Sequence, residues 1–379
     1  MFSPILLSCA IAQAPTVEAI DAALARAGAY LMKRQSEDGA WRSDRYGNFK
    51  DGWSLSPMAL SALYFVPPSE AVAASYAKGS DFVATIIGED GAPRPEALGY
   101  PVYALAGATF VLSTPPNRRH VEVRDQVVKH LLAAQLGPDH GWKPTDVDYG
   151  GWGYFHGPPT RPPDGEERDM LLSSNLSSTV FAIGALRLGG LPFDHPALVA
   201  ARHFVERCQN FEGDGGFFFT PSNEVQNKAH VTDEGVTRSY GTMTADGLRA
   251  LRQLGVPAIH PRRKRAHAWL ARRYSPERVP GDYPENREVQ RRSSYYYWVW
   301  SSSHALWGEG EDTLASAEGP IVWPMWMASS LLRRQRPDGS FANEYTDLRE
   351  DDPLVATSFA VAGLALSRLV LTGRMRTSH

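Results

Sequence analysis

One short phrase recurs along this chain: a helix-like run that ends in Gln, then Asp-Gly, then an aromatic residue. Clear copies occupy residues 35–41 and 335–341, and looser copies occupy 135–142 and 209–217. Self-similarity over tens of residues indicates stacked supersecondary units. We expect the aromatic residues of the phrase to pack on the repeat turns rather than to contact a ligand. The residues to which we assign a structural role in the repeat are Gln35, Asp38, Trp41, Trp142, Phe217, Gln335, Asp338 and Phe341.

The spacing of the Asp-Gly elements predicts six units. The interval from Asp214 to Asp338 is about twice the usual step, so a degenerate copy must lie within it. The best candidate is the run 270–274 followed by Pro280 and Gly281, which has the helix and the turn but neither the Gln nor the aromatic residue.

Each unit has the pattern of two helices. The run before each Asp-Gly is amphipathic, whereas the run after it is apolar or small nearly all round, which is typical of a buried helix. The buried runs are 56–65, 100–112, 173–188, 240–254, 294–307 and 354–370. No convincing strand pattern occurs, although residues 217–219 could be a short extended piece. We therefore predict an all-α fold in which an outer ring of helices surrounds an inner ring, as a single domain over residues 17–371.

The repeated phrase resembles the repeat of squalene-hopene cyclases and of the β subunits of protein prenyltransferases. More narrowly, the chain is similar to a bacterial group of prenyltransferase and squalene oxidase repeat proteins. The resemblance covers most of residues 17–371. It implies an (α/α)6 toroid, which is a closed ring of six helical hairpins.

The catalytic motifs of those families are missing at the matching positions. Where the cyclases carry the acid that protonates an alkene, this chain has Asn175, Ser177 and Ser178, and a hydroxyl group cannot act as that acid. Where the prenyltransferases carry zinc ligands, it has residues 292–298 and Ala356. We predict no zinc and no other cofactor. Carboxyl groups outside the family motifs that could serve as an acid are Asp246, Asp351 and Asp352, although the last two also suit a helix cap.

The connections that lead from outer to inner helices are long, so they must lie on one face of the ring, together with the N-termini of the inner helices. Those termini favour anions, and this face is the expected binding mouth. The aromatic block 295–300 must place some of its rings toward the centre. The candidate ligand-binding residues are Asp148, Trp152, Tyr154, Asn175, Arg238, Tyr240, Arg292, Tyr295, Tyr296 and Trp298.

Composition sets limits on partners and location. The net charge of −3 has no basic excess for nucleic acid, and no apolar run approaches the length of a membrane span. Residues 1–14 resemble a signal peptide with a small-x-small site at Ala12 and Ala14, or a lipoprotein leader that would anchor the chain through Cys9. We therefore expect an exported protein, with a cytoplasmic location as the alternative, and a C-terminal tail over 372–379. The oligomeric state is not predicted.

Three functions stay open at this point. The first is a protein that binds a lipid, an isoprenoid or another ligand at the mouth without catalysis, because the transferable catalytic motifs are missing. The second is an enzyme that acts on an isoprenoid or other lipid with an acid foreign to the family. The third is a carbohydrate-active toroid, which would need two carboxylates across a cleft.

Overall fold

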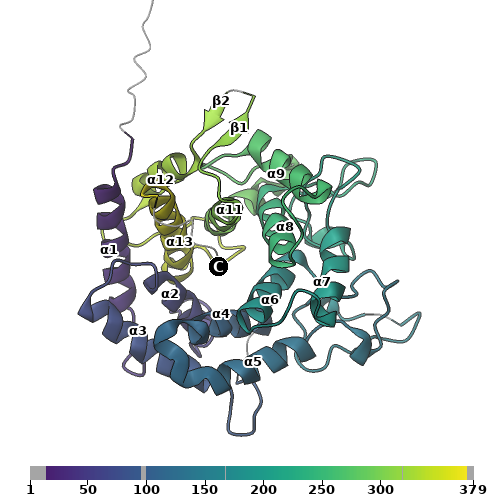
Figure 1. Ribbon diagram of the computed structural model, residues 1–379, viewed down its shortest axis with the longest axis horizontal. Helices are drawn as coiled ribbons and strands as arrows, with labels where there is room; N and C mark the ends of the chain where they lie inside the picture. Colours follow the sequence, from purple (N-terminus) through teal and green to yellow (C-terminus); the bar gives the residue numbers. More distant parts are fainter. Residues whose placement is uncertain (1–13, 95–99, 167, 318, 374–379) are drawn as a thin grey trace, which may run out of the picture.

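The computed structural model describes residues 14–94, 100–166, 168–317 and 319–373, which form thirteen α-helices and one two-stranded sheet. Twelve of the helices alternate between two concentric rings (Figure 1). The outer helices are α1 (Val17–Lys33), α3 (Glu70–Val83), α5 (Val121–Ala133), α7 (Pro196–Arg207), α9 (Pro261–Arg273) and α12 (Trp323–Arg334). The inner helices are α2 (Leu55–Leu63), α4 (Pro101–Ser113), α6 (Leu176–Leu188), α8 (Gly241–Gln253), α11 (Tyr295–Glu309) and α13 (Pro353–Leu371). The predicted all-α double ring is confirmed.

The rings close because helices distant in sequence are neighbours in space. Each inner helix packs against the next, and α13 packs against α2, while α1 contacts both α13 and α12. One hydrophobic cluster extends from Ile20 on α1 to Leu366 on α13. Outer helices bury one face in this cluster, whereas α4 and α6 are buried on most sides, which explains the alternation of amphipathic and apolar runs in the sequence.

The Gln of the repeated phrase joins neighbouring outer helices. In four units its side-chain amide donates one hydrogen bond to the glycine carbonyl of the following turn and one to a carbonyl of the next outer helix. The four sets are Gln35 with Gly39 and Ser75 (2.9 and 3.0 Å), Gln135 with Gly150 and Ala197 (both 2.8 Å), Gln209 with Gly215 and Arg262 (both 3.0 Å), and Gln335 with Gly339 and Ala23 (3.0 and 2.8 Å). The last set joins α12 to α1 and so closes the outer ring.

The aromatic residue of the phrase is fixed to the inner helix that follows it. Its backbone N–H donates to a hydroxyl group near the start of that helix. The pairs are Trp41 with Ser56 (2.9 Å), Trp152 with Thr179 (3.1 Å), Phe217 with Thr244 (3.0 Å) and Phe341 with Thr357 (2.9 Å). All four aromatic side chains are fully buried. They support the fold rather than the binding face.

In the third unit the prediction that Trp142 is the aromatic residue of the phrase was wrong. Trp152 occupies it, and Trp142 instead packs in a small separate cluster and donates its indole N–H to the Pro159 carbonyl (2.6 Å). The turn glycine of this unit is Gly150, with φ of 87° and so little space that an added Cβ would lie 2.0 Å from the carbonyl oxygen of Ala200. The chain makes an excursion between Gln135 and this turn, and the excursion contains its own Asp-x-Gly-Trp sequence.

Two further elements are additions to the ring. The short helix α10 (Glu288–Arg292) precedes α11, and strands β1 (Leu314–Ser316) and β2 (Gly319–Ile321) form an antiparallel hairpin at the rim between α9 and α12 (Figure 1). The sequence analysis missed this hairpin because strands of three residues show no periodicity. The region 217–219 contributes an isolated bridge between Gln209 and Phe217.

Helix α13 is long and apolar enough to cross a membrane by length and composition, contrary to the expectation of no such run. Of its most apolar window, 72% is buried inside the ring, as for the core helix of a globular protein. The leader, including Cys9, lies outside the described residues, as does the tail beyond residue 373. Export and lipid anchoring therefore stay predictions.

Candidate functional site

Five aromatic side chains and one histidine from four inner helices meet at the centre of the ring. They are Tyr103 on α4, Phe181 on α6, Tyr297, Trp300 and His304 on α11, and Phe359 on α13. We call these six residues the axial cluster. All six are half-buried. Phe181 stacks on Trp300 with centroids 4.8 Å apart, although α8 separates α6 from α11 in the inner ring. A contact between helices that are not neighbours places the cluster on the central side of the ring.

A chain of hydroxyl groups runs across the cluster. Tyr154 contacts Tyr103 (3.0 Å between hydroxyl oxygens), Tyr103 donates to Ser177 (2.9 Å), and Ser177 contacts Tyr297 (2.6 Å). Tyr297 then donates to a carboxylate oxygen of Asp246 (2.7 Å). Tyr103, Ser177 and Tyr297 all lie in the first turn of their helices, so the chain marks the end of the ring that the sequence predicted as the mouth.

Asp246 is a buried carboxylate with several donors. Besides Tyr297, it accepts a hydrogen bond from the Ser301 hydroxyl (2.5 Å) and one from the Arg249 guanidinium (3.0 Å), and its side chain is fully buried. Burial raises the pKa of Asp246, while the positive charge of Arg249 acts to lower it. Donors on both oxygens and a paired guanidinium stabilise the ionised form. Asp246 is therefore a paired carboxylate that organises α8 and α11 rather than a free Brønsted acid.

The deeper part of the cluster carries positive charge and a neutral histidine. The Arg249 guanidinium lies 4.2 Å from the centroid of the Trp300 ring. His304 packs against the same ring, with its Nδ1 2.8 Å from the Trp300 carbonyl oxygen. Burial, aided by Arg249, lowers the pKa of His304 to about 3, so the imidazole is neutral at ordinary pH. This surface is aromatic and holds no unpaired negative charge.

Three of the predicted aromatic contacts point away from the centre. Tyr295 bonds through its hydroxyl to Ser330 on outer helix α12 (2.9 Å), and the Trp298 indole donates to the Ser275 carbonyl (2.8 Å). Tyr296 is 3% exposed, and its ring packs edge-on against Phe341 of the repeated phrase, with centroids 5.9 Å apart. These residues were wrongly assigned because a helix buried on all sides gives no sequence signal for which side faces the axis. The spacing of three and four residues from Tyr297 to Trp300 to His304 does mark one face, but it does not say which one.

The candidate acids Asp351 and Asp352 hold the first unit to the last. Asp351 accepts hydrogen bonds from the Tyr46 hydroxyl (2.6 Å) and from Arg45 (2.8 Å). Asp352 caps α13 through a backbone N–H and accepts a hydrogen bond from the Ser43 hydroxyl (2.5 Å). Neither carboxylate is free for chemistry, so the acid assignment is corrected, and the cap interpretation applies to Asp352 alone.

The neighbouring Glu350 is an acid that the sequence analysis did not single out. It is fully buried, and its two oxygens accept the backbone N–H groups of Tyr296 (2.9 Å) and Tyr297 (2.8 Å) at the start of α11. The Asn343 amide donates a third hydrogen bond (3.0 Å). Burial raises the pKa of Glu350 to about 7, against the opposing effect of those donors and of Lys228. Its contacts make it a cap for α11.

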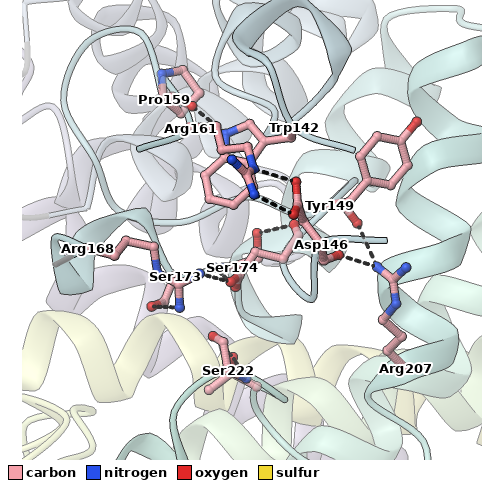
Figure 2. A network of polar contacts seen from close by, with 12 residues as sticks. Trp142, Asp146, Tyr149, Pro159, Arg161, Arg168, Ser173, Ser174, Arg207 and Ser222 are labelled. Atoms are coloured by element: carbon pink, nitrogen blue, oxygen red, sulfur yellow. Dashed lines mark hydrogen bonds and ion pairs between the residues drawn. The ribbon is translucent and has the colours of Figure 1, made fainter. Parts of the chain in front are cut away.

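The long loop before α6 is fixed to the ring by charged side chains (Figure 2). Arg161 pairs with both oxygens of Asp146 (2.8 and 3.1 Å), and Arg207 donates to the Asp146 carbonyl (3.0 Å). Asp148 is fully buried, pairs with Arg168, and accepts the Ser174 N–H (2.7 Å). Burial raises the pKa of Asp148. Asp148 holds the loop to the start of α6 and is not available to a ligand, nor is the buried Trp152.

The other candidates also have structural partners. Asn175 is the N-cap of α6 through the Ser178 N–H (2.9 Å), although its side-chain nitrogen is buried without a hydrogen-bond partner. Tyr240 is fully buried, and its hydroxyl also has no partner. Arg238 donates to the Val231 carbonyl within its own loop (3.2 Å). Arg292 is exposed and donates to the Tyr345 hydroxyl (2.7 Å). Of the ligand candidates, the structure brings Tyr154 to the axial cluster. The axial residues Phe181 and Phe359 were not predicted from the sequence.

The inner helices are poor in acids. Across α2, α4, α6, α8, α11 and α13 the acidic residues are Asp246 and Glu309, and Glu309 pairs with Arg263 of α9. Within the described ranges, no group of three or more His, Cys, Asp or Glu side chains could hold a metal ion. The axial cluster can thus bind by stacking, by apolar contact and by hydroxyl hydrogen bonds.

No family model and no curated protein matches this sequence. Solved structures do match it. A type II terpene cyclase, MstE from Scytonema, in complex with geranylgeranyl dihydroxybenzoate, has a TM-score of 0.59 at 13% identity over 93% of this chain and 98% of that chain. The GH76A α-1,6-mannanase from Salegentibacter sp. HEL1_6 has a TM-score of 0.56 at 12% identity over 93% of this chain and 99% of that chain. A glycosyl hydrolase of family 88 from Bacteroides vulgatus has a TM-score of 0.53 at 11% identity over 94% of this chain and 99% of that chain.

The chain is an α/α toroid. The same ring thus occurs in a terpene cyclase and in two glycosyl hydrolases, so the likeness specifies the fold and leaves the activity to the residues of the site. The expected relation to the fold of terpenoid cyclases is confirmed.

Proposed function

We propose that this toroid binds an isoprenoid or a similar lipid over the axial cluster, at the mouth of the ring, without protonating it. The observation that carries the proposal is the convergence of half-buried aromatic side chains from four inner helices on one central surface. Aromatic faces bind unsaturated and apolar chains by dispersion and burial of apolar area. The ligand of MstE, which carries a geranylgeranyl group, is an example of such a chain on this fold.

Acid-catalysed cyclisation is not part of the proposal. A cyclase needs a protonated carboxyl group at the centre, and the central carboxyl here is Asp246. Arg249 and two hydroxyl groups donate to it, which favours the ionised carboxylate. A proton on Asp246 would remove the negative charge that strengthens these hydrogen bonds.

A glycosidase is the second candidate because two neighbours of the fold are glycosyl hydrolases. That chemistry needs a pair of carboxyl groups, one on each side of the scissile bond. The described inner helices offer Asp246 and Glu309, and each is ion-paired. Three buried acids of the mouth loops, Asp148, Asp351 and Glu350, are engaged in pairs or caps. The lipid proposal needs no such pair.

The test uses equilibrium binding of radiolabelled geranylgeraniol to the purified full-length chain. Trp300→Ala should weaken binding at least tenfold, because it removes the ring that stacks on Phe181. The matched control is Phe193→Ala, which removes an aromatic side chain that is 53% exposed in the turn after α6 and should leave binding unchanged. Recovered geranylgeraniol should be chemically unaltered by gas chromatography and mass spectrometry.

Three outcomes contradict the proposal. Geranylgeraniol could fail to bind the wild type, or the Trp300→Ala and Phe193→Ala variants could bind it equally well, in which case the axial cluster is not the site. Saturable binding of an α-1,6-mannan oligosaccharide that Trp300→Ala abolishes would instead support the carbohydrate candidate.

A further inference from the structure

A pocket lies on the outer wall of the toroid, away from the axial cluster. It has a volume of about 510 Å³ and lies between the C-terminal end of α9, the loop that follows it, α12 and strand β2. Its walls include Arg272, Arg273, Arg278 and Arg291, together with Asp282 and Trp326. We propose that this pocket binds a phosphate ester of a small molecule, and that the arginines hold the phosphate while Trp326 contacts the rest of the molecule.

The repeat pattern explains why a pocket forms at this position. In four units a Gln from the end of one outer helix donates to a carbonyl of the next outer helix. The fifth unit has no such Gln, since α9 ends in Arg272 and Arg273 and continues into Tyr274. The hairpin of β1 and β2 lies at the rim between α9 and α12, where four of the other units have this hydrogen bond (Figure 1). The space between α9 and α12 is lined by arginines.

Arg291 is the most informative residue of the pocket. It is 8% exposed, so its guanidinium has lost most of its hydration. It donates to the Gly281 carbonyl (3.1 Å), pairs with Glu288 (3.1 Å) and lies over the Tyr283 ring (4.7 Å). Its Nε–H is buried without a hydrogen-bond partner. A buried N–H with no partner is costly, and this one is closed off from solvent. An oxyanion in the pocket would contact the part of the Arg291 side chain that stays exposed, which is 10% of it.

The charges of the wall favour a dianion. Asp282 pairs with Arg273 (2.8 Å), and Glu288 pairs with Arg291. Arg272 and Arg278 are exposed and have no ion-pair partner among the described residues. Two uncompensated guanidinium groups match the charge of a phosphate monoester, about −1.5 to −2 at neutral pH, better than that of a single carboxylate. Guanidinium groups also match the geometry of phosphate oxygens.

The size of the pocket and its aromatic wall favour an ester over free phosphate. The volume of about 510 Å³ falls in the usual range of small-molecule sites. Trp326 leaves 46% of its surface exposed at the pocket, which provides a flat apolar surface for a ring or chain. The phosphate could come from a soluble ester or from the headgroup of a lipid, and the two sources share this chemistry.

The experiment is isothermal titration calorimetry of the full-length chain in phosphate-free, low-salt buffer. Phenyl phosphate should bind at one site per chain, at least tenfold more tightly than benzoate or inorganic phosphate. Arg278→Gln should weaken phenyl phosphate binding at least tenfold. Trp326→Ala should weaken the binding of phenyl phosphate but not that of inorganic phosphate. Arg291→Lys should also weaken binding, because a lysine keeps the charge but not the planar fork.

The matched control is Arg252→Gln, the same change at an exposed arginine at the end of α8 that does not line the pocket. It should bind phenyl phosphate like the wild type. Co-sedimentation with phosphatidic acid vesicles, lost in Arg278→Gln, would identify a lipid headgroup as the source, and binding of the soluble ester alone would identify a soluble one. The proposal is overturned if no saturable binding of phenyl phosphate occurs, or if Arg252→Gln and Arg278→Gln weaken it equally. Arg278 is exposed, so this comparison stands even where Arg291→Lys fails to fold.

Discussion

Closure of the outer ring depends in part on Gln335. We predict that Gln335→Leu destabilises the protein as much as the same substitution at a contact between outer helices of consecutive units. The Gln335 amide donates to the carbonyls of Gly339 and Ala23, and Arg26 donates to its amide oxygen. Each net hydrogen bond is worth about 1 kcal/mol, so the substitution should cost about 2 to 3 kcal/mol. Leucine matches the size of glutamine, so packing changes little.

Gln35→Leu provides the comparison, because Gln35 also makes three hydrogen bonds: it donates to two carbonyls and accepts one from the Ser75 hydroxyl. The free energy of unfolding should be measured by urea denaturation for both variants, with Gln226→Leu as the control in a surface loop. In a closed ring the losses for Gln335 and Gln35 are equal. A loss below about 0.5 kcal/mol for Gln335→Leu, with the expected loss for Gln35→Leu, would refute closure at this joint.

Three further predictions concern the turns and the centre. Gly150→Ala should destabilise by more than 3 kcal/mol in urea unfolding, while Gly157→Ala, also at positive φ but in open space, should cost only about 1 kcal/mol. The folded pKa of His304, about 3, lies below the ordinary 6.5, so the unfolded chain gains a proton as pH falls through this window and the folded chain does not. Stability should therefore decrease by up to about 4 kcal/mol between pH 6.5 and 3, and His304→Gln should flatten that part of the unfolding profile. Asp246→Asn should cost about 3 to 5 kcal/mol by leaving Arg249 buried without its carboxylate, and adding Arg249→Met should restore part of the loss in a double-mutant cycle.

Much of the ring could be derived from the sequence because the repeat is local. A Gln, an Asp-Gly turn and an aromatic residue lie within seven positions at 35–41, and the alternation of amphipathic and apolar runs reports directly which helices are buried. The same local comparison showed that hydroxyl groups stand where the related cyclases carry their acid. These conclusions need no knowledge of how distant parts of the chain meet.

The third unit shows where local pattern fails. Both Trp142 and Trp152 follow glycines, and the two turns differ in what lies beside them. Gly150 approaches the backbone of α7, and only that turn is bonded by Gln135. The contact joins residues far apart in sequence, so no spacing rule distinguishes the two tryptophans.

The site depended still more on tertiary structure. In the aromatic block of α11, periodicity indicates that Tyr297, Trp300 and His304 share a face, but a helix buried on every side carries no polar stripe to orient it. The ring orients it, by turning Tyr295 and Trp298 toward the outer helix and loop. Likewise, Asp351 and Asp352 accept hydrogen bonds from residues about 300 positions earlier in the sequence, because closure of the ring brings the first unit beside the last. The sequence by itself thus determined the units and their missing catalytic motifs, whereas closure of the ring decided which side chains meet at its centre.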